Sequence, residues 1–223
     1  MAHFESLTSP SHLYTRAEVL SKPSPVPSAS GVYAWFFKEI PGIVPTDGCV
    51  TKDGLTLLYV GISPKNESSS QNIRKRIKSH YQGNAEGSTL RLTLGVLLAG
   101  KSGFPLRRVG SGKRMTLTHI GEQWLDTWMQ ENALVCWMEH PDPCAMEKEI
   151  LQALSLPLNL QDNQAHPFWA ELSDLRSRTL TKYLRGRVFV SEVSQIIVGG
   201  SPSRQRNSTT TRISVTNAGA SLA

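Results

Sequence analysis

The sequence is poor in cysteine and has no long apolar segment. Its three cysteines, Cys49, Cys136 and Cys144, are odd in number and include no Cys-x-x-Cys pair. That usage argues against a disulfide framework and against a cysteine zinc site. No apolar run approaches the roughly 20 residues that a membrane helix needs, and the N-terminus has no basic segment followed by an apolar one. We therefore expect a soluble, cytoplasmic protein that has no membrane partner.

Both ends of the chain lack apolar periodicity. The run Pro23-Ser24-Pro25-Val26-Pro27 interrupts regular structure, so residues 1–28 are interpreted as an N-terminal arm. Residues 188–198 read as a strand or an edge pairing, and Ser, Thr, Asn, Arg and Gly dominate from residue 199 onward. We expect residues 186–223 to form a mostly disordered, basic Ser/Thr-rich tail. Residues 29–185 remain as one domain, long enough to bury a core.

Basic residues are unevenly distributed along a chain of formal net charge +6. Eleven Lys and Arg lie between residues 65 and 114 against two acids, whereas seven acids lie between residues 119 and 150 against one Lys. A basic cluster is typical of a phosphate-binding surface, and a solvated charged face is the equal alternative. The candidates for nucleic-acid binding are Arg74, Lys75, Lys78, Arg91, Arg107, Arg108, Lys113 and Arg114.

Apolar patterns predict alternating strands and helices. We expect strands over residues 31–37, 55–62 and 133–138, and helices over 72–81, 88–98, 121–130, 142–154 and 168–184. The Pro, Gly and Asp-rich segment 41–54 is interpreted as a long hairpin loop, and 101–114 as an exposed loop. In the last helix the spacing favours Phe168, Leu172, Leu175 and Tyr183 facing in and Arg176, Arg178, Lys182 and Arg185 facing out.

The helix over 72–81 carries polar groups beside its apolar stripe. Ile73 and Ile77 recur at helical spacing, and Arg76 and His80 are four residues apart next to them. A cation and an imidazole are therefore held at the edge of the buried face, where a site would form. The other cations of this helix turn outward: Arg74, Lys75 and Lys78.

A second carboxyl-bearing helix is predicted over 142–154, with Asp142 as its N-cap. Glu147 falls on the same face as Ile150, and a carboxylate on an apolar stripe needs a partner, for which a cation is natural. Pro157 then favours an extended chain, so Asn159 is placed to return toward the same site.

Two short signatures followed by these polar residues resemble the GIY-YIG nuclease superfamily. The signatures are Gly31-Val32-Tyr33 and Tyr59-Val60-Gly61, and the residues that follow in family-like order and spacing are Arg76, His80, Glu147 and Asn159. The resemblance covers about residues 30–162. The segment from Ser88 to Gly95 and the long loop between the signatures are closer to the restriction-endonuclease branch. The Ser-rich loop before the basic helix and the long segment from Gly100 to Glu147 depart from the family pattern, which leaves the choice of substrate open.

The resemblance implies an α/β (α+β) fold: a small three-stranded antiparallel sheet flanked by helices, here with an added C-terminal helix. It also implies a metal-dependent endonuclease that hydrolyses DNA phosphodiester bonds with one Mg²⁺ or Mn²⁺. Glu147 would hold the metal and Arg76 would neutralise charge in the transition state. Tyr33 would be the general base, tuned by Arg76, with Tyr59 and His80 beside it, and Asn159 would orient backbone or phosphate.

Each of these residues also has a simpler interpretation. The two tyrosines would then be ordinary strand residues, Arg76 and Glu147 a structural ion pair, and His80 a surface histidine. The alternative function is a catalytically inactive nucleic-acid-binding module of the same fold. The sequence alone leaves open the preference for DNA or RNA, the recognised bases and the oligomeric state, although cutting both strands would suit a homodimer.

Overall fold

The computed structural model describes residues 4–66, 68–110 and 114–179. Lys113, the predicted tail 186–223 and the end of the predicted C-terminal helix, with Tyr183, Lys182 and Arg185, lie outside the described residues. None of the helices in the described part is long and apolar enough to cross a membrane.

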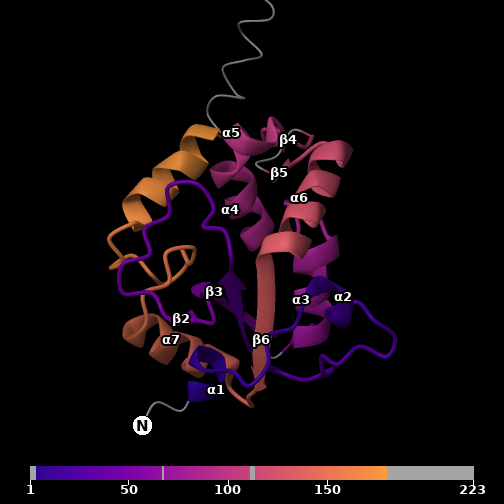
Figure 1. Ribbon diagram of the computed structural model, residues 1–223, viewed down its shortest axis with the longest axis vertical. Coiled ribbons are helices and arrows are strands. Elements are labelled where there is room, and N and C mark those ends of the chain that lie inside the picture. The colour runs from indigo at the N-terminus through magenta and orange to yellow at the C-terminus, as the bar shows by residue number, and fades with distance from the viewer. Residues whose placement is uncertain (1–3, 67, 111–113, 180–223) are drawn as a thin grey trace, which may run out of the picture. The chain divides into compact units, whose positions relative to one another are not determined.

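A four-stranded antiparallel sheet lies at the centre of the domain (Figure 1). Its order is β2 (Thr51–Lys52), β3 (Leu55–Ser63), β1 (Gly31–Phe37) and β6 (Ala133–Glu139). The three predicted strands are present, so the α/β class is confirmed, but the strand number is not. The additional strand, β2, arises because Asp53 and Gly54 both adopt positive φ and close a two-residue hairpin onto β3.

Helices cover both faces of the sheet. One face packs against α3 (Ile73–Gln82), α4 (Thr89–Leu97), α6 (His119–Asn132) and a helical segment over residues 169–179. The other packs against α1 (Glu5–Thr8) and α7 (Pro143–Ala153), and Figure 1 shows α1 and α7 opposite α3 and α6. Two further helices, α2 (Arg16–Val19) and α5 (Ala99–Ser102), are short. A two-stranded ribbon pairs β4 (Arg107–Arg108), within the segment predicted as an exposed loop, with β5 (Met115–Thr116), directly after that segment.

Strand alternation determines which side chains reach the site. Along β1, Tyr33 and Trp35 face the core beneath α3, whereas Val32 and Ala34 face α7. Tyr33 is opposite Gly61 and Trp35 is opposite Tyr59 in the antiparallel register. Both signature tyrosines therefore lie on the same face of the sheet.

The segment interpreted as an N-terminal arm packs into the domain. Phe4 and Leu7 are buried in the core on the α7 side, and Val19 is buried in the core on the α3 side. Two backbone hydrogen bonds join Tyr14 to Val135 of the edge strand β6, with N···O distances of 2.8 and 3.0 Å. This pairing satisfies backbone groups that an open sheet edge would leave exposed. Residues 4–28 are therefore integral to the folded unit.

Candidate active site

The glycines of the two signatures allow close approaches that no other residue would allow. A Cβ atom on Gly61 would lie 2.5 Å from the hydroxyl oxygen of Tyr33, because the Tyr33 ring lies directly over this glycine. A Cβ atom on Gly31 would collide with the carbonyl oxygen of Met138 on the neighbouring strand. Gly61 thus creates the space in which the Tyr33 phenol is held.

A chain of hydrogen bonds runs from this phenol into α4. The Tyr33 hydroxyl is 2.9 Å from Nε2 of His80, and Nδ1 of His80 is 2.7 Å from Oγ of Ser88. Ser88 Oγ also accepts the backbone N–H of Arg91 at 3.1 Å, which caps α4. His80 is fully buried, so the interpretation of a surface histidine is wrong.

Burial controls the protonation of both rings. Desolvation raises the pKa of Tyr33 well above its ordinary value, and the neighbouring Tyr59 raises it further, whereas Arg76 lowers it. We expected Arg76 to tune Tyr33 toward neutral pH. Its effect has the expected sign, but the effect of burial is larger. Burial likewise lowers the pKa of His80 well below its ordinary value, and nearby cations, Arg76 first, act in the same direction. At neutral pH the phenol is protonated and the imidazole is neutral.

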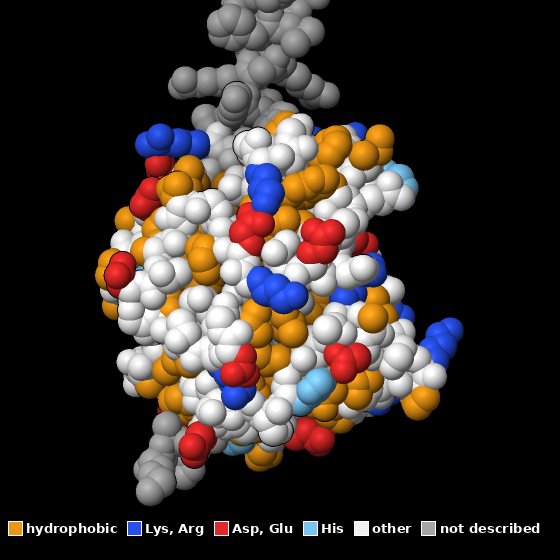
Figure 2. Space-filling view, in the orientation of Figure 1, with side chains coloured by type: hydrophobic (Ala, Val, Ile, Leu, Met, Phe, Trp, Pro, Cys, Tyr) orange, Lys and Arg blue, Asp and Glu red, His pale blue; other side chains and the backbone are white. Residues whose placement is uncertain are grey.

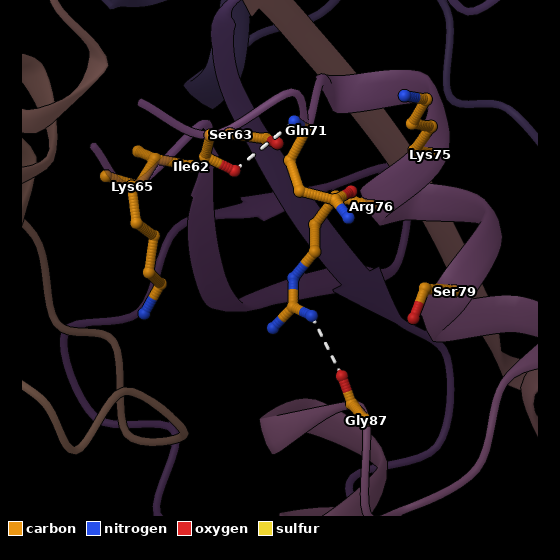
Figure 3. A pocket seen from close by; sticks show the side chains of 9 residues that line it. Ile62, Ser63, Lys65, Gln71, Lys75, Arg76, Ser79 and Gly87 are labelled. Atoms are coloured by element: carbon orange, nitrogen blue, oxygen red, sulfur yellow. Dashed lines mark hydrogen bonds between the residues drawn. The ribbon is translucent and has the colours of Figure 1, made fainter. Parts of the chain in front are cut away.

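Arg76 directs its guanidinium into a hollow of about 510 Å³ beside α3. Figure 3 shows this guanidinium and the ammonium group of Lys65 pointing into the same space. Nη1 of Arg76 donates to the carbonyl oxygen of Gly87 at 2.9 Å. Among the ion pairs of the described residues there is none for Arg76, so the predicted alternative of a structural pair with Glu147 is wrong.

Glu147 lines a second hollow of about 460 Å³, together with Tyr59 and Asn159. Lys65 lines both hollows, so they adjoin. Within the described part of the chain the half-buried Glu147 carboxylate has no hydrogen bond or ion pair. Burial raises its pKa above the ordinary value, although Lys65 acts in the opposite direction.

The five side chains lie close enough to influence one another. Both Arg76 and Glu147 shift the pKa of Tyr33, and both also shift that of Tyr59, in each case with burial as the largest cause of the net rise. Arg76 also lowers the pKa of His80. Tyr59 and Glu147 line one hollow and Arg76 the adjoining one, whereas the buried Tyr33 and His80 line neither and lie close enough for their pKa values to respond to Arg76.

Asn159 binds backbone, which is one of the two roles expected for it. Its Oδ1 accepts the N–H of Val60 at 3.0 Å and its Nδ2 donates to the carbonyl oxygen of Val60 at 2.7 Å. The neighbouring N–H of Leu158 donates to the carbonyl oxygen of Leu58 at 3.1 Å. The segment after α7 is thereby attached to the edge of β3, which positions Glu147 beside Tyr59.

The comparison with protein families identifies this arrangement. Residues 31–178 match the family described as the GIY-YIG catalytic domain. The chain belongs to this family. No curated protein and no solved structure matches the chain significantly. Membership of the GIY-YIG family indicates nuclease activity in general, with DNA as the implied substrate, and such nucleases are generally metal-dependent.

The donor set of this GIY-YIG domain fits a hard divalent cation. The described residues contain no group of three or more His, Cys, Asp or Glu side chains suited to a metal ion. A single carboxylate without a protein partner, facing a hollow, suits Mg²⁺, which keeps most of its waters and shares oxygen ligands with a substrate phosphate. Glu147 is the residue of the GIY-YIG site that could hold the ion.

One of the predicted nucleic-acid-binding residues is buried in the GIY-YIG domain. Arg91 is 0 % exposed. Its Nη2 lies 2.6 Å from Oε2 of Glu122, its Nη1 lies 2.7 Å from Oδ1 of Asp126, and Nη1 also donates to the carbonyl oxygen of His80. The prediction for Arg91 is wrong, because the acids of the segment 119–150 pair with it inside the domain.

The remaining basic candidates lie at the surface, except Lys113, which lies outside the described residues. Arg74, Lys75 and Lys78 are exposed on α3, as predicted, and Arg74 also donates to the carbonyl oxygen of Val26. Arg107 is exposed, Arg108 is half-buried, and the exposed Arg114 pairs with Glu86 at 2.8 Å. Figure 2 shows one face of the domain, on which basic and acidic side chains of the described residues are interspersed. DNA binding by the exposed candidates stays a prediction.

Four residues at the GIY-YIG site were not among the predicted site residues. Ser88 was expected only as the first residue of the helix over 88–98, and nothing in the sequence indicates its bond to His80. Thr89 lines the hollow of Glu147 beside Tyr59 and lowers the pKa of its phenol, and Lys65 lines both hollows. Arg176 was expected to face out, but it is half-buried and lines the hollow of Glu147. Its position four residues after the buried Leu172 is the signal that places it on the inner face.

Proposed function

We propose that this GIY-YIG domain is a metal-dependent endonuclease that hydrolyses DNA phosphodiester bonds, using one Mg²⁺ or Mn²⁺ ion. The observation that carries the proposal is a hydrogen-bonded phenol and imidazole buried beside a carboxylate and a guanidinium that form no ion pair with the described residues. Proton transfer, metal binding and charge neutralisation are the three requirements of phosphodiester hydrolysis, and each has a suitable group here.

Glu147 holds the ion in this proposal. When bound, a divalent cation polarises a phosphate oxygen and lowers the pKa of nearby acidic groups. Burial raises the pKa of Glu147, so the ionised form of this half-buried carboxylate lowers the free energy of unfolding when no cation is bound. A bound cation would remove that penalty, which supports the assignment. The carboxylate must be ionised to bind the ion, so acid should weaken metal binding.

Tyr33 receives a proton from the attacking water while its own proton moves to Nε2 of His80. The hydrogen bond of 2.9 Å between the two groups gives this proton a direct route. A neutral His80 that donates Nδ1–H to Ser88 keeps Nε2 free to accept. The transfer avoids a free phenolate, which the raised pKa of Tyr33 disfavours, but it charges His80, whose pKa is lowered, so it requires the negative charge of a bound phosphate near the imidazole.

Arg76 neutralises the charge that grows on the phosphate oxygens in the transition state. The guanidinium points into a hollow, donates to the carbonyl oxygen of Gly87 and acts on the Tyr33 phenol, so its remaining N–H groups can bind a phosphate. Tyr59 lies in the adjoining hollow, where its hydroxyl can donate to a phosphate oxygen. Asn159 acts by holding the backbone of β3.

The alternative function, a nucleic-acid-binding module without catalysis, uses the same exposed cations. Glu147 distinguishes the two proposals. A binding module gains nothing from a half-buried carboxylate beside its anionic ligand, since the two repel each other, whereas a metal-dependent nuclease requires one. The structure therefore supports the nuclease more strongly.

The two functions are separated by assaying binding and cleavage on the same preparations. Supercoiled plasmid is incubated with wild type, Glu147→Ala and Arg76→Ala in MgCl₂ or MnCl₂, and binding of a labelled DNA duplex is measured without divalent metal. A nuclease predicts nicked or linear plasmid from wild type only, with duplex binding largely kept in both variants. Binding that falls with salt, with no product in either metal, indicates the binding module. Light scattering with and without duplex tests the expected homodimer.

A further inference from the structure

The helical segment over residues 169–179 contributes a cation to the hollow that contains Glu147. Arg176, together with Ser173 on the preceding turn, lines this hollow opposite the segment after α7. Its positive charge acts to lower the pKa of the Tyr59 phenol. Each of the two adjoining hollows is therefore lined by one guanidinium, that of Arg76 in the first and that of Arg176 in the second.

Arg176 has little that compensates for its burial. Its Nη1 is 3.4 Å from Oγ1 of Thr93, a long hydrogen bond to a neutral group. Among the ion pairs of the described residues, none includes Arg176. Arg178, two residues further on, differs in both respects: its side chain is 77 % exposed, and its Nε lies 2.6 Å from Oδ2 of Asp174.

A half-buried guanidinium that pairs with no carboxylate of the described residues requires another anion. Burial of an unpaired charge is unfavourable, and the planar guanidinium matches the oxygen pairs of a phosphate. The hollow of about 460 Å³ is large enough for a phosphate group, and Lys65 adds positive charge to its wall. Glu147 also lines this hollow and repels an anion. Phosphate binding is therefore favoured where the positive charge of Lys65 and Arg176 exceeds the negative charge of the carboxylate, or where a divalent ion neutralises the carboxylate.

We propose that Arg176 binds a phosphate of the DNA backbone next to the one that is cut, and so positions the substrate. The inference rests on the proposed function and names a binding residue for the same site. Arg76 and Arg176 line different hollows, which is why we assign them to different phosphates. Removal of Arg176 should therefore weaken DNA binding more than it slows the chemical step.

The salt dependence of DNA binding tests this assignment. Binding of a short labelled DNA duplex is measured across a series of KCl concentrations, without divalent metal, for wild type, Arg176→Gln and the control Arg178→Gln. Loss of one phosphate contact reduces the slope of log K against log salt by about 0.9. We expect that reduction in Arg176→Gln, with affinity weakened about tenfold, and neither change in Arg178→Gln. Arg176→Lys keeps the charge and should restore most of the slope.

Cleavage kinetics separate a failure of this inference from a failure of the proposed function. With plasmid and MgCl₂, Arg176→Gln should raise KM and leave kcat within about twofold, since the contact is made in ground state and transition state alike. A wild-type chain that cuts DNA while Arg176→Gln keeps both the slope and KM overturns the Arg176 assignment alone. A wild type that binds no duplex at any salt concentration contradicts the proposed function and this inference together. Thermal unfolding of each variant excludes a general loss of structure.

Discussion

Replacing Gly61 with alanine should disable the site without touching any charged residue. The new Cβ would lie 2.5 Å from Oη, 2.6 Å from Cζ and 2.7 Å from Cε2 of Tyr33. Favourable contact begins near 3.5 Å, so the ring must move by about 1 Å. The bond of 2.9 Å between Tyr33 and His80 cannot survive that shift in its present geometry.

A displacement of this size has two measurable consequences. Misplacement of a reacting group by about 1 Å costs about 100-fold in rate, and overpacking of a filled core lowers the free energy of unfolding by about 1–3 kcal/mol. The rate is measured as plasmid nicking under single-turnover conditions in MgCl₂, and stability by urea denaturation. DNA binding should be kept, because the cations that line the two hollows are unchanged.

Gly100→Ala is the matched control for Gly61→Ala. A Cβ on Gly100 meets no atom within 4 Å, and the residue lies in the short helix α5. This variant should nick plasmid at the wild-type rate. If Gly61→Ala were also to cut at the wild-type rate, the position of the Tyr33 phenol would not matter for cleavage, and the proposed proton route would be refuted.

Three further substitutions test separate parts of the account. Ser88→Ala removes both the cap of α4, at a cost of about 1 kcal/mol, and the partner of His80 Nδ1. Its cleavage rate should fall and Ser88→Thr should restore it; equal rates for the two variants would argue against a role for this bond. Arg91→Met leaves Glu122 without an ion pair and Asp126 paired with Arg16 alone, and it should lower the free energy of unfolding by about 3 kcal/mol, as measured in urea. If the free energy of unfolding were unchanged and DNA binding were weaker, the original prediction of Arg91 as a DNA-binding residue would be supported instead. The pKa of Glu147 is raised by burial in the folded state, so wild type loses stability as pH rises from the ordinary value of 4.5 through this raised pKa. Glu147→Gln, which has no such proton, should therefore melt higher than wild type at neutral pH and equally near pH 4; a lower melting temperature at neutral pH would contradict the burial of this carboxylate.

Local patterns of the sequence predict the part of the site that lies on α3, whereas the two tyrosines were named through the family resemblance. The spacing of Arg76 and His80 against Ile73 and Ile77 predicts that these four residues share one side of a helix. These features depend only on neighbours within a few residues, where helical and strand periods are reliable. The outward orientation of Lys78 and its neighbouring cations follows from the same periodicity and is confirmed.

Features that depend on distant partners could not be predicted in this way. Arg91 has the sequence context of a surface cation, and only the fold brings Glu122 and Asp126 within 3 Å of it. The second bond of Ser88 requires the buried imidazole of His80, which comes from another helix.

Two other features that were not predicted, strand β2 and the inward orientation of Arg176, do have a signal in the sequence. The Asp53-Gly54 pair is a known hairpin turn, and it closes the fourth strand, β2. Arg176 lies four residues from Leu172, which places it on the inner face of its helix, but its charge favoured an outward assignment.

Conversion of supercoiled plasmid in MgCl₂ by wild type and Tyr33→Phe, purified side by side, tests the central claim most directly. The single oxygen that this substitution removes is the one that bonds His80. We predict nicked and linear plasmid from wild type and at least about 100-fold slower conversion by Tyr33→Phe, with equal DNA binding and equal folding. Equal conversion by the two proteins, or none by wild type while it binds DNA, would contradict the account.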